Sequence, residues 1–222
     1  MNELELKNLW QNSNEKLEKS LNINRINSKE ISRLKIYHFI SSMKPIKIFT
    51  LLIGIIWVGF GAVILGNLFI YAFTEVSKFF LFSASIQVGL TAAAIWIYIY
   101  QLINIYQIDI AEPIVKTQER LASLKKSTLW VTRILFLQLP VWTTFYLSES
   151  MLENGNWLMW IIQAAVTLSF AYIAGWLFFN IKFENRNKKW FQLIFKGKEW
   201  TPLMKSMELL KEIEDYKSTK KE

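Results

Sequence analysis

Four runs of apolar residues, separated by polar segments, dominate the pattern of the chain. The first, Ile48–Phe73, holds 26 residues with no Asp, Glu, Lys, Arg or His among them. At about 1.5 Å of rise per residue, a helix of this length reaches roughly 39 Å, more than the roughly 30 Å hydrocarbon core of a bilayer. Three further runs are Phe79–Ile103, Leu129–Leu147 and Trp157–Ile181. The sequence therefore predicts an all-α integral membrane protein with four transmembrane helices in a bundle.

The segments between the runs predict how the helices connect. Only five residues, Thr74–Lys78, separate the first two runs, so these two helices should form an antiparallel hairpin. The longer segment Asn104–Thr128 contains Pro113–Lys126, a basic amphipathic stretch that we expect as a separate helix on the membrane surface. Pro140 lies inside the third run and predicts a kink there.

Small residues within the runs indicate where two helices approach each other closely. In lipid, Gly and Ala let helix backbones pack together, because no larger side chain holds them apart. The first run carries four of the eight glycines, which predicts that this helix is the packing centre of the bundle. The expected helix-packing residues are Gly54, Gly59, Ala62, Gly66, Gly89 and Gly175.

The residues before and after the bundle (46–181) form two polar segments, 1–45 and 182–222. Glu3–Leu21 reads as an amphipathic helix, and Asn22–Asn27 is expected to interrupt it before a second helix begins. The apolar face of the first helix, here called the N-terminal ridge, consists of Leu6, Leu9, Trp10, Leu17 and Leu21.

The N-terminal ridge needs a partner, and three are available. It can pack on the apolar face of the last helix, lie on the membrane, or dock into a groove of another protein, in which case its five residues are partner-binding residues. The face on the last helix, here called the C-terminal stripe, consists of Leu203, Met207, Leu210 and Ile213.

The segment Lys182–Trp200 alternates cations with aromatic side chains directly after the last apolar run. Cations and large aromatic rings are typical of segments that lie in the membrane interface. The residues expected at the membrane surface are Lys188, Lys189, Trp190, Phe191 and Phe195.

Lys and Arg gather at the two ends of the chain, nine before the first apolar run and eleven from Lys182 onward. Because basic segments stay on the cytoplasmic side, the sequence predicts a multi-pass protein of the cell inner membrane with both termini in the cytoplasm. The net charge of +8 then reflects contact with anionic lipid. We therefore expect the lipid bilayer as a partner and no nucleic acid.

The sequence offers little for catalysis. The chain has no cysteine and a single histidine, His38, which excludes thiolate chemistry and the usual His-rich metal sites. We find no phosphate-binding loop, no dinucleotide-binding glycine pattern and no HExxH motif. The prediction is a protein that is not an enzyme, with no catalytic, cofactor-binding or metal-binding residues.

Uncharged polar residues inside the runs leave a second function open. Such residues would line a pathway if the bundle, alone or as a homo-oligomer, were a small transporter or channel subunit, with Pro140 as a hinge. They are Ser83, Gln87, Thr91, Gln138, Thr143, Gln163 and Thr167.

Six residues near the N-terminus carry a resemblance. The run Leu6-Lys7-Asn8-Leu9-Trp10-Gln11, followed by a polar segment and several apolar spans, resembles uncharacterised multi-span inner-membrane proteins of Bacteroidetes and other Gram-negative bacteria. Genes for such proteins can lie beside those of extracytoplasmic-function sigma factors, so the resemblance implies an anti-sigma-like signalling role with a sigma factor as partner. The usual anti-sigma pattern has one span and a His/Cys cluster, whereas this chain has four predicted spans and no cysteine.

Together these patterns favour a non-enzymatic membrane regulator or scaffold. Its terminal helices would bind a cytoplasmic protein, with Trp10 at the centre of the contact, because buried aromatic residues often dominate such interfaces.

Overall fold

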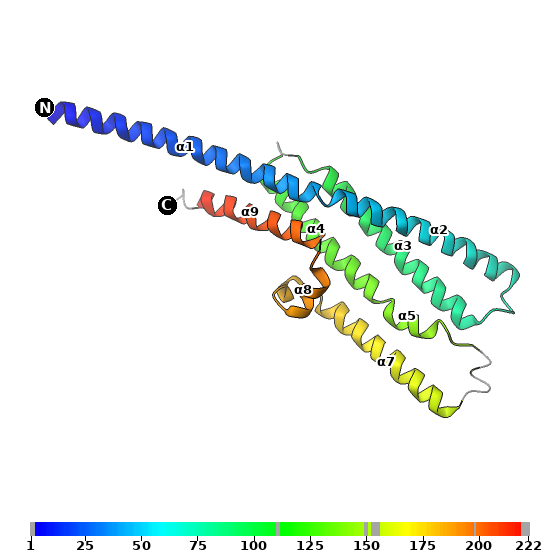
Figure 1. Cartoon of the computed structure of the whole chain (residues 1–222). Coiled ribbons are helices and arrows are strands. Elements are labelled where there is room, and N and C mark those ends of the chain that lie inside the picture. Colours follow the sequence, from blue (N-terminus) through cyan, green and yellow to red (C-terminus); the bar gives the residue numbers. More distant parts are fainter. Residues whose placement is uncertain (1–2, 110–111, 149–150, 152–155, 198, 219–222) are drawn as a thin grey trace.

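The computed structural model describes residues 3–109, 112–148, 151, 156–197 and 199–218, and all regular structure in these ranges is helical (Figure 1). The elements, in chain order, are α1 (Glu3–Ser41), α2 (Lys44–Tyr71), α3 (Lys78–Tyr106), α4 (Ile114–Phe136), α5 (Leu139–Thr144), α7 (Trp157–Asn180), the short 3-10 helix η1 (Phe183–Asn185), α8 (Lys189–Phe195) and α9 (Trp200–Ser218).

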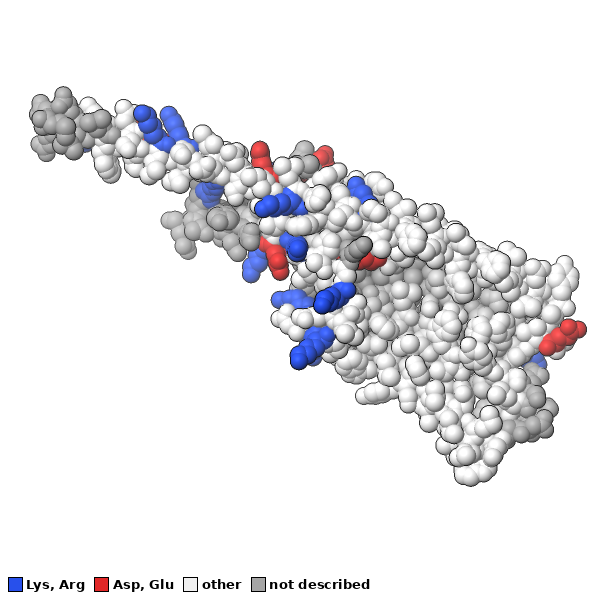
Figure 2. Space-filling view, viewed as in Figure 1, with Lys and Arg blue, Asp and Glu red and all other residues white. Residues whose placement is uncertain are grey.

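Among the described residues, three helices are long and apolar enough to cross a membrane: α2, at the end of a long helical stretch, α3 and α7. Their ranges agree with the first, second and fourth apolar runs to within a few residues. Most of their surface is apolar and exposed, which indicates lipid rather than water around them. Figure 2 shows the same division, because charged side chains gather at the end of the molecule near α9 and the broad apolar surface beyond it is nearly free of them.

The third apolar run does not form one continuous helix. It contributes the second half of α4 and the short α5, with an interruption at Leu137 and Gln138. Proline lacks a backbone N–H, and its ring clashes with the carbonyl of the fourth residue before it, which for Pro140 is Phe136 at the end of α4. Leu137 and Gln138 instead donate to carbonyls three residues back. The predicted kink is confirmed.

The apolar helices form an open layer in the order α2, α3, α4 with α5, and α7 (Figure 1). The packing centre is α3, since it contacts α2 on one side and α4 and α5 on the other. The expectation that the first apolar helix is the packing centre is therefore wrong. The reason is that α2 lies at the edge of the layer and presents most of its side chains to the outside.

Among the glycines of α2, Gly61 lies in the closest contact with α3, because an added Cβ there would lie 2.9 Å from Cγ2 of Val88. Gly54 also lies at this contact, with Cγ1 of Ile95 at 3.2 Å from such a Cβ. An added Cβ would meet nothing within 4 Å at Gly59, Gly66, Gly89 and Gly175. Ala62 is exposed. Of the six expected packing residues, Gly54 is therefore the one that these distances place at the contact between α2 and α3.

Two expected helix boundaries are absent. Asn22–Asn27 does not interrupt α1, which runs through it without a break. The physical reason is that this segment contains no Gly or Pro, and asparagine costs only about 0.7 kcal/mol of helix propensity per residue. Similarly, Pro113–Lys126 is not a separate surface helix, because α4 continues from Ile114 into the third apolar run.

One apolar cluster joins the start and the end of the chain. The last turns of α1 pack against α9, and α4 closes the cluster from the other side. The C-terminal stripe lies in this cluster, with Leu203, Leu210 and Ile213 buried and Met207 partly buried. This cluster, here called the terminal cluster, is made by Ile36, Ile40, Met43, Ile105, Ile108, Ile114, Leu121, Leu124, Leu203, Leu210 and Ile213.

Replacing Gly61 with leucine should weaken the contact between α2 and α3. The new side chain would collide with Val88, and overpacking of this kind costs about 1–3 kcal/mol. The measurement is the free energy of unfolding of the purified protein in detergent micelles. Gly59→Leu is the matched control on the same helix, and we expect it to change stability by at most about 0.5 kcal/mol. Equal losses in the two variants would contradict the assigned packing face.

Candidate functional site

The first part of α1 projects from the rest of the molecule (Figure 1). The side chains that are described between residues 7 and 31 are all exposed, and the residues of α1 that are buried in the cluster with α9 are Ile36 and Ile40, further along the helix. At about 1.5 Å per residue, the projecting part (residues 3–31) is roughly 44 Å long. A helix of this length that buries no described side chain gains little stability from packing, so a partner that covers one face would stabilise it.

The N-terminal ridge lies on this projecting part. Its residues Trp10, Leu17 and Leu21 are 67%, 59% and 60% exposed. The side chains of Leu6 and Leu9 lie outside the described ones. The described residues of the ridge therefore do not pack on the C-terminal stripe, which is occupied by Ile36, Ile40 and Met43 instead.

Trp10 and Leu17 of the ridge are part of a longer uncharged face. Residues spaced alternately by three and four positions lie along one side of a helix, as in the seam of a coiled coil. This face of α1 carries no charge from Trp10 to Ile31, whereas the charged residues of the same stretch lie on the other sides. Its members are Trp10, Ser13, Leu17, Ser20, Asn24, Asn27 and Ile31. An exposed, uncharged helical face with large residues at intervals is suited to a groove or a helix of another protein.

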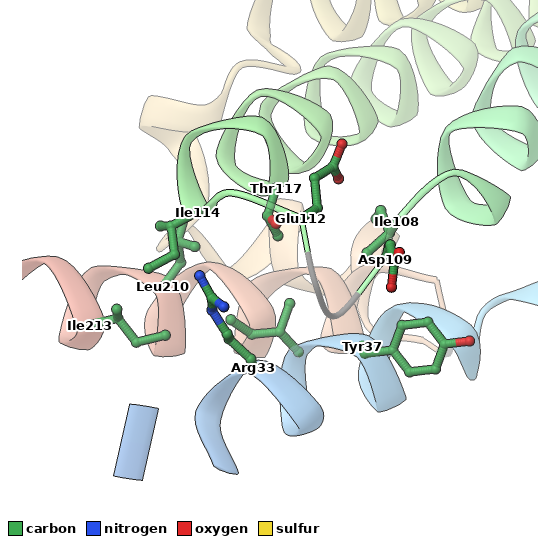
Figure 3. Close-up of a pocket in the computed structure, with 10 residues that line it drawn as sticks. Arg33, Tyr37, Ile108, Asp109, Glu112, Ile114, Thr117, Leu210 and Ile213 are labelled. Carbon is green, nitrogen blue, oxygen red and sulfur yellow. The ribbon is translucent and has the colours of Figure 1, made fainter. Parts of the chain in front are cut away.

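The base of the projecting part is held by α9 and by the turn that joins α3 to α4. Figure 3 shows the small cavity at this base, with Arg33 and Tyr37 from α1, Ile108 and Asp109 after α3, and Leu210 from α9 among the residues around it. The cavity measures only about 20 Å³, enough for about one water molecule. It therefore offers no room for a substrate, and its residues serve to hold α1.

A buried ion pair lies beside the terminal cluster, where α2 begins. The side chain of Lys47 is 0% exposed, and its Nζ donates to Oε1 of Gln101 at 2.6 Å and to Oε2 of Glu199 at 3.0 Å. The ammonium group also lies 4.6 Å from the ring centroid of Tyr98, whose hydroxyl donates to Glu199. Three segments, α2, α3 and the residue before α9, are thus joined at one charged group.

The groups that surround the buried ammonium of Lys47 all come from the chain itself. Burying an ammonium group costs several kcal/mol unless a counter-ion and hydrogen bonds compensate for the lost water, and Glu199, Gln101 and Tyr98 supply these. Within the described chain, Nε2 of Gln101 has no hydrogen-bond partner, so the cluster is not fully satisfied. Sequence reasoning missed this site because Lys47 and Glu199 are 152 residues apart; the one available signal was a lysine directly before an apolar run.

The polar residues considered for a transport pathway bond to one another across the helices. Gln138 donates to Thr91 at 3.0 Å, and Thr143 donates to Thr167 at 3.0 Å. Further contacts of this kind join Ser83 to Thr144 and Gln163 to the backbone oxygen of Thr143. Gln87 is buried in α3. Mutual hydrogen bonds of this kind are typical of helix packing in a bilayer.

Two residues expected at the membrane surface lie inside the protein. Phe191 and Phe195 are 0% and 6% exposed, because their rings stack on each other and pack against Trp200. One face of α8 therefore packs onto the end of α7, whereas Leu193 on another face of α8 is 84% exposed. Trp190 is partly buried against Trp176, whereas Lys188 and Lys189 are exposed.

No group of His, Asp and Glu side chains in the described part of the chain is arranged to hold a metal ion. In comparisons with protein families, curated proteins and solved structures, the chain matches none.

Removing one partner of the buried ion pair should destabilise the protein more than removing both. Glu199→Gln leaves the Lys47 ammonium group buried without a counter-ion, which costs about 3 kcal/mol. Lys47→Met should cost less, because the Glu199 side chain is 25% exposed and can reach water. In the double variant no charge remains unpaired, so its loss should be smaller than the sum of the single losses.

The measurement is the free energy of unfolding in detergent for all four proteins of this cycle. Glu208→Gln, at an exposed position of α9, is the control for loss of one negative charge and should change little. Strictly additive losses at positions 47 and 199 would show that the pair does not couple α2 to α9.

Proposed function

We propose that the chain is a non-enzymatic membrane regulator or scaffold that binds a cytoplasmic protein through the projecting part of α1. The observation that carries this proposal is a long helix whose described side chains between residues 7 and 31 are all exposed, with one uncharged face, and whose later turns are buried against α9. A helix that served only to complete the fold would bury its apolar residues in the chain's own core.

The partner is a soluble protein that offers an apolar groove or a helical face to α1. Trp10 is the natural centre of the contact, because a large aromatic ring that becomes fully buried contributes more than the residues around it. A sigma factor, which the resemblance implies, is a partner of this class. The Ser and Asn residues along the same face would give the contact its register without a charged group to desolvate.

We further propose four membrane crossings, with the segment Leu129–Thr144 of α4 and α5 as the third. Contact between α1 and α9 supports this arrangement, since it brings the start of α2 and the end of α7 to the same side of the layer. Because α2, α3 and α7 contribute three crossings, an even total needs a fourth one. The kink at Pro140 is tolerated in a membrane helix because neighbouring side chains satisfy the freed backbone groups.

The distribution of charge supports cytoplasmic termini and an inner-membrane location. Apart from Arg133, one cation lies outside the terminal and middle segments: Lys78, the first residue of α3. The side of the layer that carries α1 and α9 is therefore the cytoplasmic side.

Photo-cross-linking tests the proposed contact. A photo-reactive amino acid at position 10 or 17 of the full-length protein should capture a defined soluble protein in cells, whereas one at position 15, on the opposite side of the same helix, should not. Trp10→Ala should then weaken binding of the purified partner about 30-fold, corresponding to roughly 2 kcal/mol for a central aromatic residue.

Capture of lipid alone, or of second copies of the chain alone, would overturn the regulator proposal. Equal capture from positions 10 and 15 would mean that the exposed face does not select the partner. Glu18→Ala, at an exposed position away from the face, is the control for Trp10→Ala and should leave binding within about twofold.

Cysteine labelling tests the four crossings, and the natural absence of cysteine makes it direct. Single cysteines at Glu75 and Asn156 should react with a membrane-impermeant maleimide added to intact cells, and those at Lys126 and Lys182 should react only after the membrane is opened. If position 156 behaved like position 126, α4 and α5 would not cross, and the proposed topology would be wrong.

A further inference from the structure

A groove runs between α3 and α4 on the surface of the molecule. Its volume is about 420 Å³. It is lined by Trp96, Ile97, Tyr100, Ser123, Lys126, Ser127 and Trp130. It is separate from the projecting part of α1 and from the buried ion pair, neither of which contributes a residue to it.

The two ends of the groove differ in chemistry. Tyr100 and Ser123 lie at one end, where their hydroxyl groups form a hydrogen bond of 2.7 Å, and the Lys126 side chain is exposed beside them. Trp96 and Trp130 lie toward the other end. Trp96 precedes Tyr100 by one turn of α3, and Trp130 follows Ser123 by two turns of α4. The groove therefore passes from a positive, hydroxyl-rich end to an aromatic end.

This change from polar to aromatic lining runs in the direction of the proposed third membrane crossing. Along α4, Lys125 and Lys126 are the last residues of the basic half, and the apolar third run begins at Leu129. With α4 and α5 as the proposed third crossing, the polar end of the groove lies at the level of the lipid headgroups, and the aromatic end lies on the hydrocarbon side of the interface, a region where tryptophan is common. The seven lining residues include one cation and no carboxylate, so the polar end attracts an anion.

The Trp130 ring at the aromatic end of the groove is held in place by residues that do not line the groove. The Arg133 guanidinium group lies 5.2 Å from the Trp130 ring centroid and donates to the backbone oxygen of Ile181 at 2.6 Å. The ring of Phe178 meets Trp130 edge to face, with centroids 6.0 Å apart. Trp130 is therefore oriented before any ligand arrives, which lowers the entropy cost of binding.

We propose that this groove binds one anionic phospholipid of the surrounding bilayer. Its phosphate accepts a hydrogen bond from Lys126 and one from whichever hydroxyl of the Tyr100–Ser123 pair does not donate to the other, and the first part of an acyl chain lies against Trp96 and Trp130. A free phosphate ion would use the polar end only, whereas a lipid uses the full length of the groove. The proposal does not depend on the protein partner of α1.

Native mass spectrometry of the purified protein in mild detergent tests this site. The probes are phosphatidylglycerol, phosphatidylcholine with the same acyl chains, and inorganic phosphate. We expect a single retained phosphatidylglycerol, weaker retention of phosphatidylcholine, and no displacement of the lipid by inorganic phosphate. Lys126→Gln should weaken phosphatidylglycerol binding about fivefold, as expected for one lysine near an anionic lipid surface.

Lys125→Gln is the matched control. The Lys125 ammonium group lies over the Phe183 ring, 4.2 Å from its centroid, and does not line the groove, so this change should leave binding within about twofold. Lys126→Arg keeps the charge and should retain binding. Equal losses for Lys125→Gln and Lys126→Gln, an unchanged affinity in Lys126→Gln, or displacement by inorganic phosphate would each overturn the assignment.

Discussion

The apolar contact among α1, α4 and α9 determines where the other parts of the chain lie. Ile40, Met43, Leu124 and Leu203 are at most 1% exposed in this cluster, although they come from the start, middle and end of the sequence. Because α2 begins directly after Met43, the cluster fixes the place where the first helix of the apolar layer begins. It also fixes the direction in which the first part of α1 leaves the molecule (Figure 1).

Apolar contact alone does not specify how far two helices slide along each other, because it has no strong directional preference. The Lys47 ammonium group adds that direction, since its hydrogen bonds to Gln101 and Glu199 form in one register only. Such a pair contributes little net stability compared with apolar residues of the same volume, but leaving either charge alone is costly. Its consequence is therefore a unique arrangement of α2, α3 and α9.

The sequence predicted the parts that depend on local composition. α2, α3 and α7 were evident because each apolar run is longer than a bilayer is thick, and Pro140 located the break because its chemistry acts within one turn. The parts that depend on distant contacts were missed. Phe191 and Phe195 have the composition of an interfacial segment, and only the position of Trp200 shows that they are buried. Lys47 likewise finds its counter-ion 152 residues away.

A single helix, α4, relates the proposed protein contact to the proposed lipid site. Leu121 and Leu124 face the terminal cluster that holds α1, while Ser123 and Lys126 face the groove. Residues on one helix keep fixed positions relative to one another. The polar end of the groove and the base of α1, which both contact α4, are therefore at a fixed distance from each other. Trp10 precedes Lys44 by 34 residues of nearly continuous helix, or roughly 50 Å at about 1.5 Å per residue. A protein bound at Trp10 would therefore lie far along α1 from the start of α2 and from the terminal cluster.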